Sequence, residues 1–227
     1  MDKKYEMLPD DTIEVDGHIL HRIRALKDIP SIGVRAGDIG GYIEKENNLD
    51  HTGNCWISNN AKVFCNARVS DNAHVYGNSL VCDSADVYDD AEIFDRASVY
   101  GNAEVFDNAK VYGCAMVYDD AAVFDNAHVY CNAEVFGSAD VYDDARVCGC
   151  VWVCDSAQVY GNVKVYDYAR VFGCTQMYGY AQVYGDAKVY GNVKVHGNIR
   201  VTGHTKLSNW FDVIVHSLFS KLKRSKF

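Results

Sequence analysis

Histidine and cysteine are the residues of this chain whose chemistry could support catalysis or metal binding. Three histidines, His74, His128 and His196, lie in the long repeated part of the sequence. A histidine acts as a general base only when it reaches the substrate in a site that limits access of water. No inserted loop that could enclose a substrate follows any of the three, so the sequence favours a non-catalytic protein. His128 is the best of these candidates, because it is central and close in sequence to Glu134.

The nine cysteines show no spacing that we would assign to a metal. The closest group is Cys148, Cys150 and Cys154, and no two cysteines of the repeat are separated by 18 residues, the distance expected between stacked neighbours. An odd number of cysteines without a recognisable signal peptide favours a reducing, cytoplasmic location. We therefore expect surface thiols, no metal site and no cofactor.

These residues are set in a six-residue repeat that runs from Ile57 to Leu207 without insertion or deletion. Each unit has an inward aliphatic residue such as Val99, then Gly or Asp two positions later, and a small residue such as Ala103 after four. Valine favours an extended backbone, whereas Gly and Asp accept a bend with positive φ. The repeat predicts an all-β solenoid in which three units form one turn, with about eight turns and a length of about 40 Å.

The residue after each inward valine is usually aromatic and should lie at an edge of the solenoid. Spacing by 18 residues places these rings in three stacked ladders. The ladders could simply reinforce the edges, or they could form a binding surface, since exposed aromatic area is typical of interfaces. The candidate binding residues are Tyr100, Phe106, Tyr112, Tyr118, Phe124, Tyr130 and, on a wall with Leu80 and Met116, Trp152.

The charge is uneven along the chain. A net charge of −9 and a pI near 5.3 argue against direct binding of nucleic acid. Acidic residues crowd the middle, including Asp89, Asp90, Asp119 and Asp120, whereas basic residues gather late. Carboxylates at near-regular spacing could imitate a phosphate backbone in front of a basic protein. That hypothesis requires the carboxylates to lie on one side of the solenoid.

The ends of the chain lack the repeat and divide it into three parts. Residues 1–50 should form an N-terminal β cap, residues 51–207 the solenoid, and residues 208–227 an amphipathic helix. In the cap, Asp16-Gly17 predicts a hairpin turn between 12–15 and 18–23, after a polar and loosely held segment 1–11.

After Leu207, apolar residues recur with helical spacing. This helix could cover the end of the solenoid, join chains into an oligomer, or touch an anionic membrane, although no apolar stretch is long enough to span one and we expect no membrane association. Its candidate cap or oligomer residues are Trp210, Phe211, Ile214, Val215, Leu218 and Leu222.

The repeat resembles that of bacterial hexapeptide-repeat left-handed β-helix proteins. In addition, segments 21–28, 36–49 and 53–57 resemble the lead-in of YdcK-type proteins of bacteria and phages. The resemblance implies the left-handed coil. It also implies an alternative function, an acyl-CoA-dependent acyltransferase that would bind acetyl-CoA as a trimer and use a histidine as base.

Our leading prediction is a non-catalytic rod that binds a protein partner through its aromatic edges and acidic middle. The sequence also allows self-association of the chain as a dimer or trimer.

Overall fold

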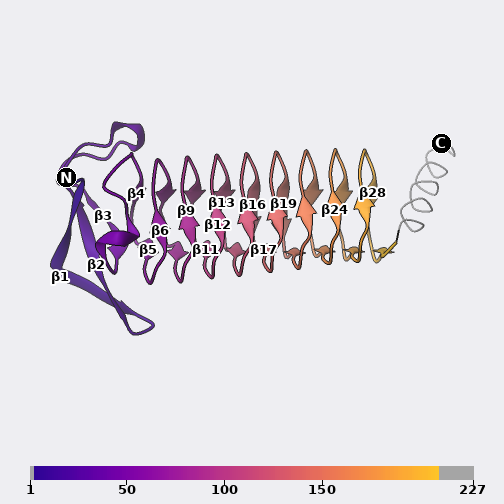
Figure 1. The fold of residues 1–227 in the computed structure, drawn as a ribbon, viewed down its shortest axis with the longest axis horizontal. Helices are drawn as coiled ribbons and strands as arrows, with labels where there is room; N and C mark the ends of the chain where they lie inside the picture. The colour runs from indigo at the N-terminus through magenta and orange to yellow at the C-terminus, as the bar shows by residue number, and fades with distance from the viewer. Residues whose placement is uncertain (1–2, 210–227) are drawn as a thin grey trace.

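The chain folds into an all-β parallel solenoid in the computed structural model, which describes residues 3–209 (Figure 1). Three parallel sheets run the length of the rod, and we call them walls 1, 2 and 3 in the order in which the chain visits them. The predicted all-β parallel solenoid is confirmed. The left-handed coil stays a prediction from the resemblance.

Each wall is a stack of short strands, one from every turn. Wall 1 contains β3 (Ile39–Ile43), β5 (Lys62–Val63), β8 (Leu80–Val81), β11 (Ser98–Val99), β14 (Met116–Val117), β17 (Glu134–Val135), β20 (Trp152–Val153), β23 (Arg170–Val171), β26 (Lys188–Val189) and β29 (Lys206–Leu207). Wall 2 contains β6 (Arg68–Val69), β9 (Asp86–Val87), β12 (Glu104–Val105), β15 (Ala122–Val123), β18 (Asp140–Val141), β21 (Gln158–Val159), β24 (Gln176–Met177) and β27 (Lys194–Val195). Wall 3 contains β4 (Trp56–Ile57), β7 (His74–Val75), β10 (Glu92–Ile93), β13 (Lys110–Val111), β16 (His128–Cys131), β19 (Arg146–Gly149), β22 (Lys164–Val165), β25 (Gln182–Val183) and β28 (Arg200–Val201).

The register between neighbouring strands is fixed at 18 residues. Ser98 lies beside Met116 and Val99 beside Val117, and the same step recurs along every wall. The inward valines and the alanines four positions later are fully buried, as Val99 and Ala103 illustrate. Burial of each valine contributes about 1.5–3 kcal/mol, so the stacked valines form one continuous core.

Three edges join the walls, and we name each by the walls that it connects. Residues 100–103 belong to edge 1–2, residues 106–109 to edge 2–3 and residues 112–115 to edge 3–1. The bend falls where the repeat predicts it, since Gly101 has φ 73° and Asp107 has φ 55°. The edges are also bonded from turn to turn, because the amide of Asn102 donates to the carbonyl of Asp119 at 2.7 Å.

The solenoid begins earlier than the repeat suggests. Within the described residues wall 3 has nine strands, and each contains an inward position of the repeat, from Ile57 to Val201. The lead-in already follows the solenoid path, because β3 pairs in parallel with β5 and Leu49 bridges to Val69. Gly40 and Gly41 allow this close approach, since a Cβ at either position would lie within 2.6 Å of an isoleucine side-chain atom.

The N-terminal cap extends wall 1. Strands β1 (Tyr5–Val15) and β2 (His18–Ala25) form the predicted hairpin around Asp16-Gly17, and β2 pairs antiparallel with β3. Two short 3₁₀ helices, η1 (Pro30–Ile32) and η2 (Glu46–Asn48), follow in the lead-in.

The expectation that residues 1–11 are loosely held is wrong for the described residues of this segment. Tyr5 is buried and its hydroxyl donates to the carbonyls of Glu46 and Leu49. The Lys4 ammonium donates to the carbonyl of Thr52 and to Cys55 Sγ. These contacts attach the start of β1 to the first turn of the rod.

The predicted C-terminal helix and its six candidate residues lie outside the described residues. Within residues 3–209, no helix has the length and hydrophobicity needed to cross a membrane.

Stacking at the edges can be tested with glycine substitutions. Gly197→Ala should lower the free energy of unfolding by about 1–2 kcal/mol, because φ at this position is +70° but no atom of residues 3–209 lies within 4 Å of a new Cβ. Gly101→Ala should lower the free energy of unfolding by about 1–3 kcal/mol more than Gly197→Ala does, because the new Cβ would lie 2.7 Å from the Asp119 nitrogen. Urea unfolding followed by circular dichroism gives both values, and equal losses would contradict tight stacking.

Candidate functional site

The four candidate aspartates lie on one side of the rod. Asp89 and Asp90 are on edge 2–3, and Asp119 and Asp120 are on edge 1–2, so the two pairs border wall 2. We call wall 2 between Asp71 and Asp155, together with its two edges, the acidic surface. Its carboxylates belong to Asp71, Asp83, Asp86, Asp89, Asp90, Glu104, Asp107, Asp119, Asp120, Asp125, Asp140, Asp143, Asp144 and Asp155. Across residues 69–193, all of which are described, wall 2 and these edges carry no Lys or Arg.

Hydrogen bonds between turns hold these carboxylates in place. At the positive-φ position, the aspartate Oδ2 accepts from the backbone amide one turn further along. For example, the amide of Gly137 donates to Asp119 at 3.2 Å and that of Asp107 donates to Asp89 at 3.4 Å. At the following position, Asn102 Nδ2 donates to Asp120 Oδ1 at 2.9 Å. The acidic rows therefore have a structural role as well as a charge.

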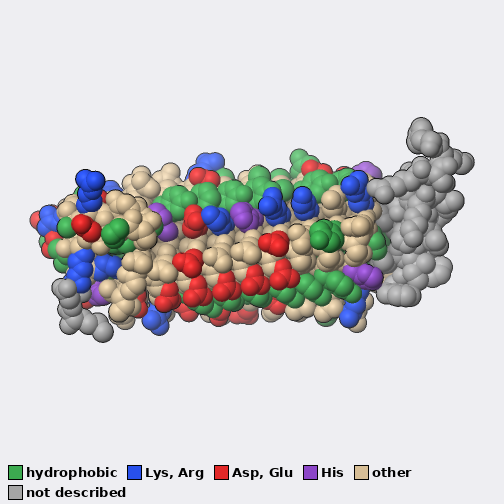
Figure 2. All heavy atoms as spheres, turned by 90° about the horizontal axis from the view of Figure 1, so that it is seen from above, with side chains coloured by type: hydrophobic (Ala, Val, Ile, Leu, Met, Phe, Trp, Pro, Cys, Tyr) green, Lys and Arg blue, Asp and Glu red, His purple; other side chains and the backbone are tan. Residues whose placement is uncertain are grey.

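Wall 3 carries the opposite charge. Its outward residues after Trp56 are His74, Glu92, Lys110, His128, Arg146, Lys164, Gln182 and Arg200. Glu92 is paired with Lys110 at 2.7 Å. Figure 2 shows a row of acidic side chains along the rod and, parallel to it, a row of Lys, Arg and His side chains. Adjacent walls of the rod thus present opposite charges to solvent.

The three candidate histidines do not form a site together. His74 and His128 are on wall 3, three turns apart, and His196 stacks on Tyr178 on edge 2–3. Burial lowers the pKa of His74, whose Nε2 lies 2.9 Å from Ser58 Oγ. Burial, followed by the charges of Arg146 and Lys110, also lowers the pKa of His128.

Glu134 does not face His128, because it lies on wall 1. It accepts hydrogen bonds from the Tyr118 hydroxyl at 3.1 Å and from Trp152 Nε1 at 3.1 Å. Proximity in sequence therefore does not produce a base with an orienting carboxylate.

The aromatic ladders form as the spacing predicts. Tyr100 and Tyr118 stack with centroids 4.9 Å apart and planes inclined by 2°, and Phe136 continues the ladder on edge 1–2. On edge 2–3 the ladder runs without a break from Tyr88 to His196. Tyr112 and Tyr130 stack on edge 3–1. Burial within the stack raises the pKa of Tyr142 to about 12.

Trp152 is held flat against its neighbours on wall 1. The Arg170 guanidinium lies 4.2 Å from its ring centroid, and its indole nitrogen donates to Glu134. Leu80 and Met116 on the same wall are only half exposed. Trp152 is therefore an exposed ring that contacts a cation, a carboxylate and, edge to face at 6.4 Å, the ring of Phe136.

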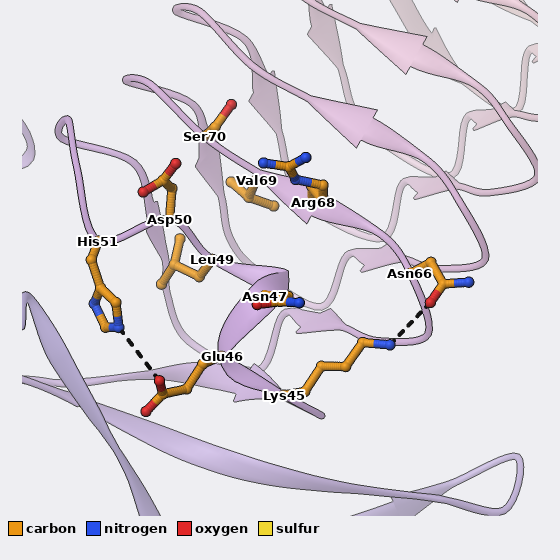
Figure 3. A pocket seen from close by; sticks show the side chains of 10 residues that line it. All are labelled: Lys45, Glu46, Asn47, Leu49, Asp50, His51, Asn66, Arg68, Val69 and Ser70. Carbon is orange, nitrogen blue, oxygen red and sulfur yellow. Dashed lines mark hydrogen bonds and ion pairs between the residues drawn. The ribbon is translucent and has the colours of Figure 1, made fainter.

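A hollow of about 520 Å³ lies between the lead-in and the start of wall 2 (Figure 3). Lys45, Glu46, Asp50, His51 and Arg68 are its ionisable lining residues. A hydrogen bond from Lys3 lowers the pKa of Glu46, and hydrogen bonds from Thr52 lower that of Asp50. Sequence analysis missed this hollow, because its lead-in residues lie outside the repeat.

A comparison with known families agrees with this geometry. The family model described as the YdcK beta solenoid repeat matches residues 67–83 and 181–203, which lie near the start and the end of the rod. Within these two segments the chain carries repeats similar to the YdcK β-solenoid repeat. No curated protein matches its sequence.

In this rod, cysteines interrupt two of the ladders. Cys154 takes the ring position between Phe136 and Phe172 on edge 1–2, and Cys148 takes the one between Tyr130 and Tyr166 on edge 3–1. Cys154 is half-buried, and burial raises the pKa of its thiol to about 11. All nine cysteines are free.

Restoring a ring at Cys154 should stabilise the rod. Cys154→Phe should raise the free energy of unfolding by about 1–3 kcal/mol, since each of two new ring pairs contributes about 0.5–1.5 kcal/mol. Cys174→Phe is the control, because Cys174 is exposed and stands outside the ring positions. Urea unfolding should show a gain for Cys154→Phe only; an equal gain in the control would mean that stacking is not its cause.

Proposed function

We propose that this rod is a non-catalytic binding protein whose acidic surface engages a basic macromolecular partner. The gathering of carboxylates on wall 2 and its edges, with no Lys or Arg between Arg68 at one end and Lys194 at the other, is the observation that carries the proposal. Such a one-sided field attracts a basic protein and orients it as it approaches.

The density of charge supports a narrower version, imitation of a nucleic-acid backbone. The acidic surface offers roughly three carboxylates per turn of about 4.8 Å, or about one charge per 1.6 Å of rod. Double-stranded DNA carries one charge per roughly 1.7 Å of its axis. A protein with a basic groove that fits DNA is therefore the partner that we propose, and the rod would compete with DNA for it.

Rigidity is the second supporting feature. Each edge aspartate that accepts an amide hydrogen bond from the next turn has its position fixed before a partner arrives. Binding to a surface that is already ordered costs less conformational entropy than binding to mobile side chains.

The aromatic ladders suit the same partner. Both edges that border wall 2 carry stacked rings, including Tyr100 and Tyr118 on one and Phe106 and Phe124 on the other. An arginine of the partner can pair with a carboxylate while its apolar stem packs against the exposed edges of the neighbouring rings. We do not propose acyl transfer or acetyl-CoA binding, because no specific observation of the described residues favours it.

Neutralisation of four carboxylates tests the proposal. The variant Asp89→Asn, Asp90→Asn, Asp119→Asn, Asp120→Asn should keep the fold, because Asn59 already occupies the same bend with φ 58° and accepts the same bond from Gly77. At about 0.5 kcal/mol per exposed ion pair, it should bind a basic partner roughly thirty-fold more weakly. The measurement is displacement of a fluorescent DNA duplex from a purified linker histone.

A matched pair of double variants separates position from net charge. Asp89→Asn with Asp119→Asn removes two charges from the acidic surface. Asp95→Asn with Asp167→Asn removes two from edge 3–1, where the aspartates accept the same type of amide bond. Only the first pair should weaken displacement. Equal effects, or none from the quadruple variant, would rule out the acidic surface as the binding site.

A further inference from the structure

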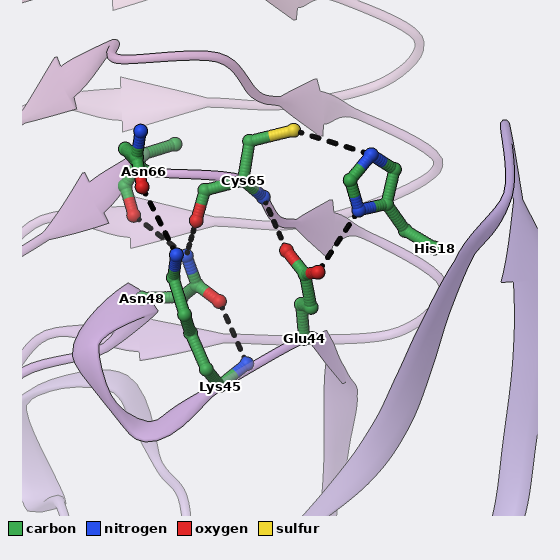
Figure 4. Close-up of polar contacts among 7 residues, drawn as sticks. His18, Glu44, Lys45, Asn48, Cys65 and Asn66 are labelled. Atoms are coloured by element: carbon green, nitrogen blue, oxygen red, sulfur yellow. Dashed lines mark hydrogen bonds and ion pairs between the residues drawn. The ribbon is translucent and has the colours of Figure 1, made fainter.

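A cysteine, a histidine and a glutamate meet where the hairpin touches the rod (Figure 4). His18 begins β2, Glu44 follows β3, and Cys65 lies on the first bend of edge 1–2. His18 Nδ1 lies 2.9 Å from Glu44 Oε1, and His18 Nε2 lies 3.6 Å from Cys65 Sγ. The second oxygen of Glu44 accepts the Cys65 amide at 2.7 Å.

The position of Cys65 in the repeat is unusual. In the rod it has a positive φ of 55°, at the bend where other turns place Gly, Asp or Asn. Among residues with a side chain, Asn and Asp adopt this conformation most readily, because their short polar side chains can hydrogen-bond locally. Cys131 is the other cysteine at a described bend, with φ 63°.

The distance between Cys65 Sγ and His18 Nε2 fits two ligands of one metal ion. With Zn–S near 2.3 Å and Zn–N near 2.0–2.1 Å, two ligands of a tetrahedral zinc ion lie about 3.5 Å apart. The observed separation of Cys65 Sγ and His18 Nε2 is 3.6 Å. The two ligands therefore need little movement to hold one ion.

Glu44 completes the arrangement as the carboxylate that orients the histidine. Histidines that bind metals through one nitrogen commonly donate the other N–H to a carboxylate, which fixes the tautomer. In this chain Glu44 Oε1 lies 2.9 Å from His18 Nδ1, in the position of such a carboxylate. It therefore favours the tautomer whose free Nε2 lone pair faces Cys65.

We propose that Cys65 and His18 bind a divalent zinc-class ion, with Glu44 as the orienting carboxylate and water in the remaining positions. A sulfur and nitrogen donor pair selects zinc over magnesium or calcium, which prefer oxygen ligands. Binding releases the Cys65 thiol proton to solvent, because the thiolate is the ligand.

The ion would join parts of the chain that are far apart in sequence. His18 and Cys65 are separated by 47 residues and belong to the hairpin and to the first full turn of the rod, respectively. The site would therefore fix the cap to the rod, independently of the acidic surface.

Cobalt(II) is the probe for this site, because a cysteine ligand produces a sulfur-to-cobalt charge-transfer band. We expect tag-free, metal-stripped protein to bind one Co²⁺ per chain with this band and with release of about one proton, and Zn²⁺ to remove the band by displacing the cobalt without further proton release. Glu44→Gln should weaken binding roughly 10–100-fold. His18→Gln should weaken it further.

Cys65→Asn should abolish the band without loss of fold, since Asn59 shows that asparagine accepts this bend. Cys131→Asn is the matched control, because it removes a cysteine from the same position in the repeat, and it should leave the band unchanged. Absence of the band from the native protein would overturn the proposal. So would its survival in Cys65→Asn or its loss in Cys131→Asn, each of which would place the ion elsewhere.

Discussion

Hydrogen bonding between turns at a constant step of 18 residues is the constraint on which the rest of the molecule depends. The strands of each turn are too short to be stable alone, and each gains its partners from the turns before and after. The step holds only if every hexad has the same length, which requires a tight bend at one fixed position. Gly101 and Asp107 show how the chain provides it, with positive φ two residues after each buried valine.

The same constraint turns sequence spacing into surface pattern. Residues 18 apart lie about 4.8 Å apart, so a residue type repeated at that interval becomes a continuous row. Rings then stack, as Tyr142 does on Tyr160 at 4.8 Å, and aspartates accept bonds from the next turn. The acidic rows thus serve the fold and the surface together. The fold does not require the aspartates to lie on one side of the rod, since Gly101 and Gly113 adopt the same positive φ without a charge.

The repeated part of the fold could be predicted because its rules are local: valine, bend, alanine and period suffice to place Asp89 and Asp119 beside the same wall. The cap could be predicted only in outline, because its contacts are long-range. Nothing in the sequence around Lys4 indicates that its ammonium donates hydrogen bonds to the Thr52 carbonyl and to Cys55 Sγ. The cluster of His18, Glu44 and Cys65 was missed for the same reason, although a cysteine at a bend reserved for Gly, Asp or Asn was a visible signal.

The N-terminal hairpin also limits how the rod can associate. In wall 1, β3 pairs in parallel with β5 but antiparallel with β2, so the parallel stack ends there. A second rod cannot continue it with the same register, because β1 and β2 run in alternating directions and Tyr5, Ile23 and Trp56 close the core at this end. End-to-end growth through this end of wall 1 is therefore disfavoured. The surfaces left for a partner along the described rod are its sides, where the acidic wall 2 and the basic wall 3 lie next to each other.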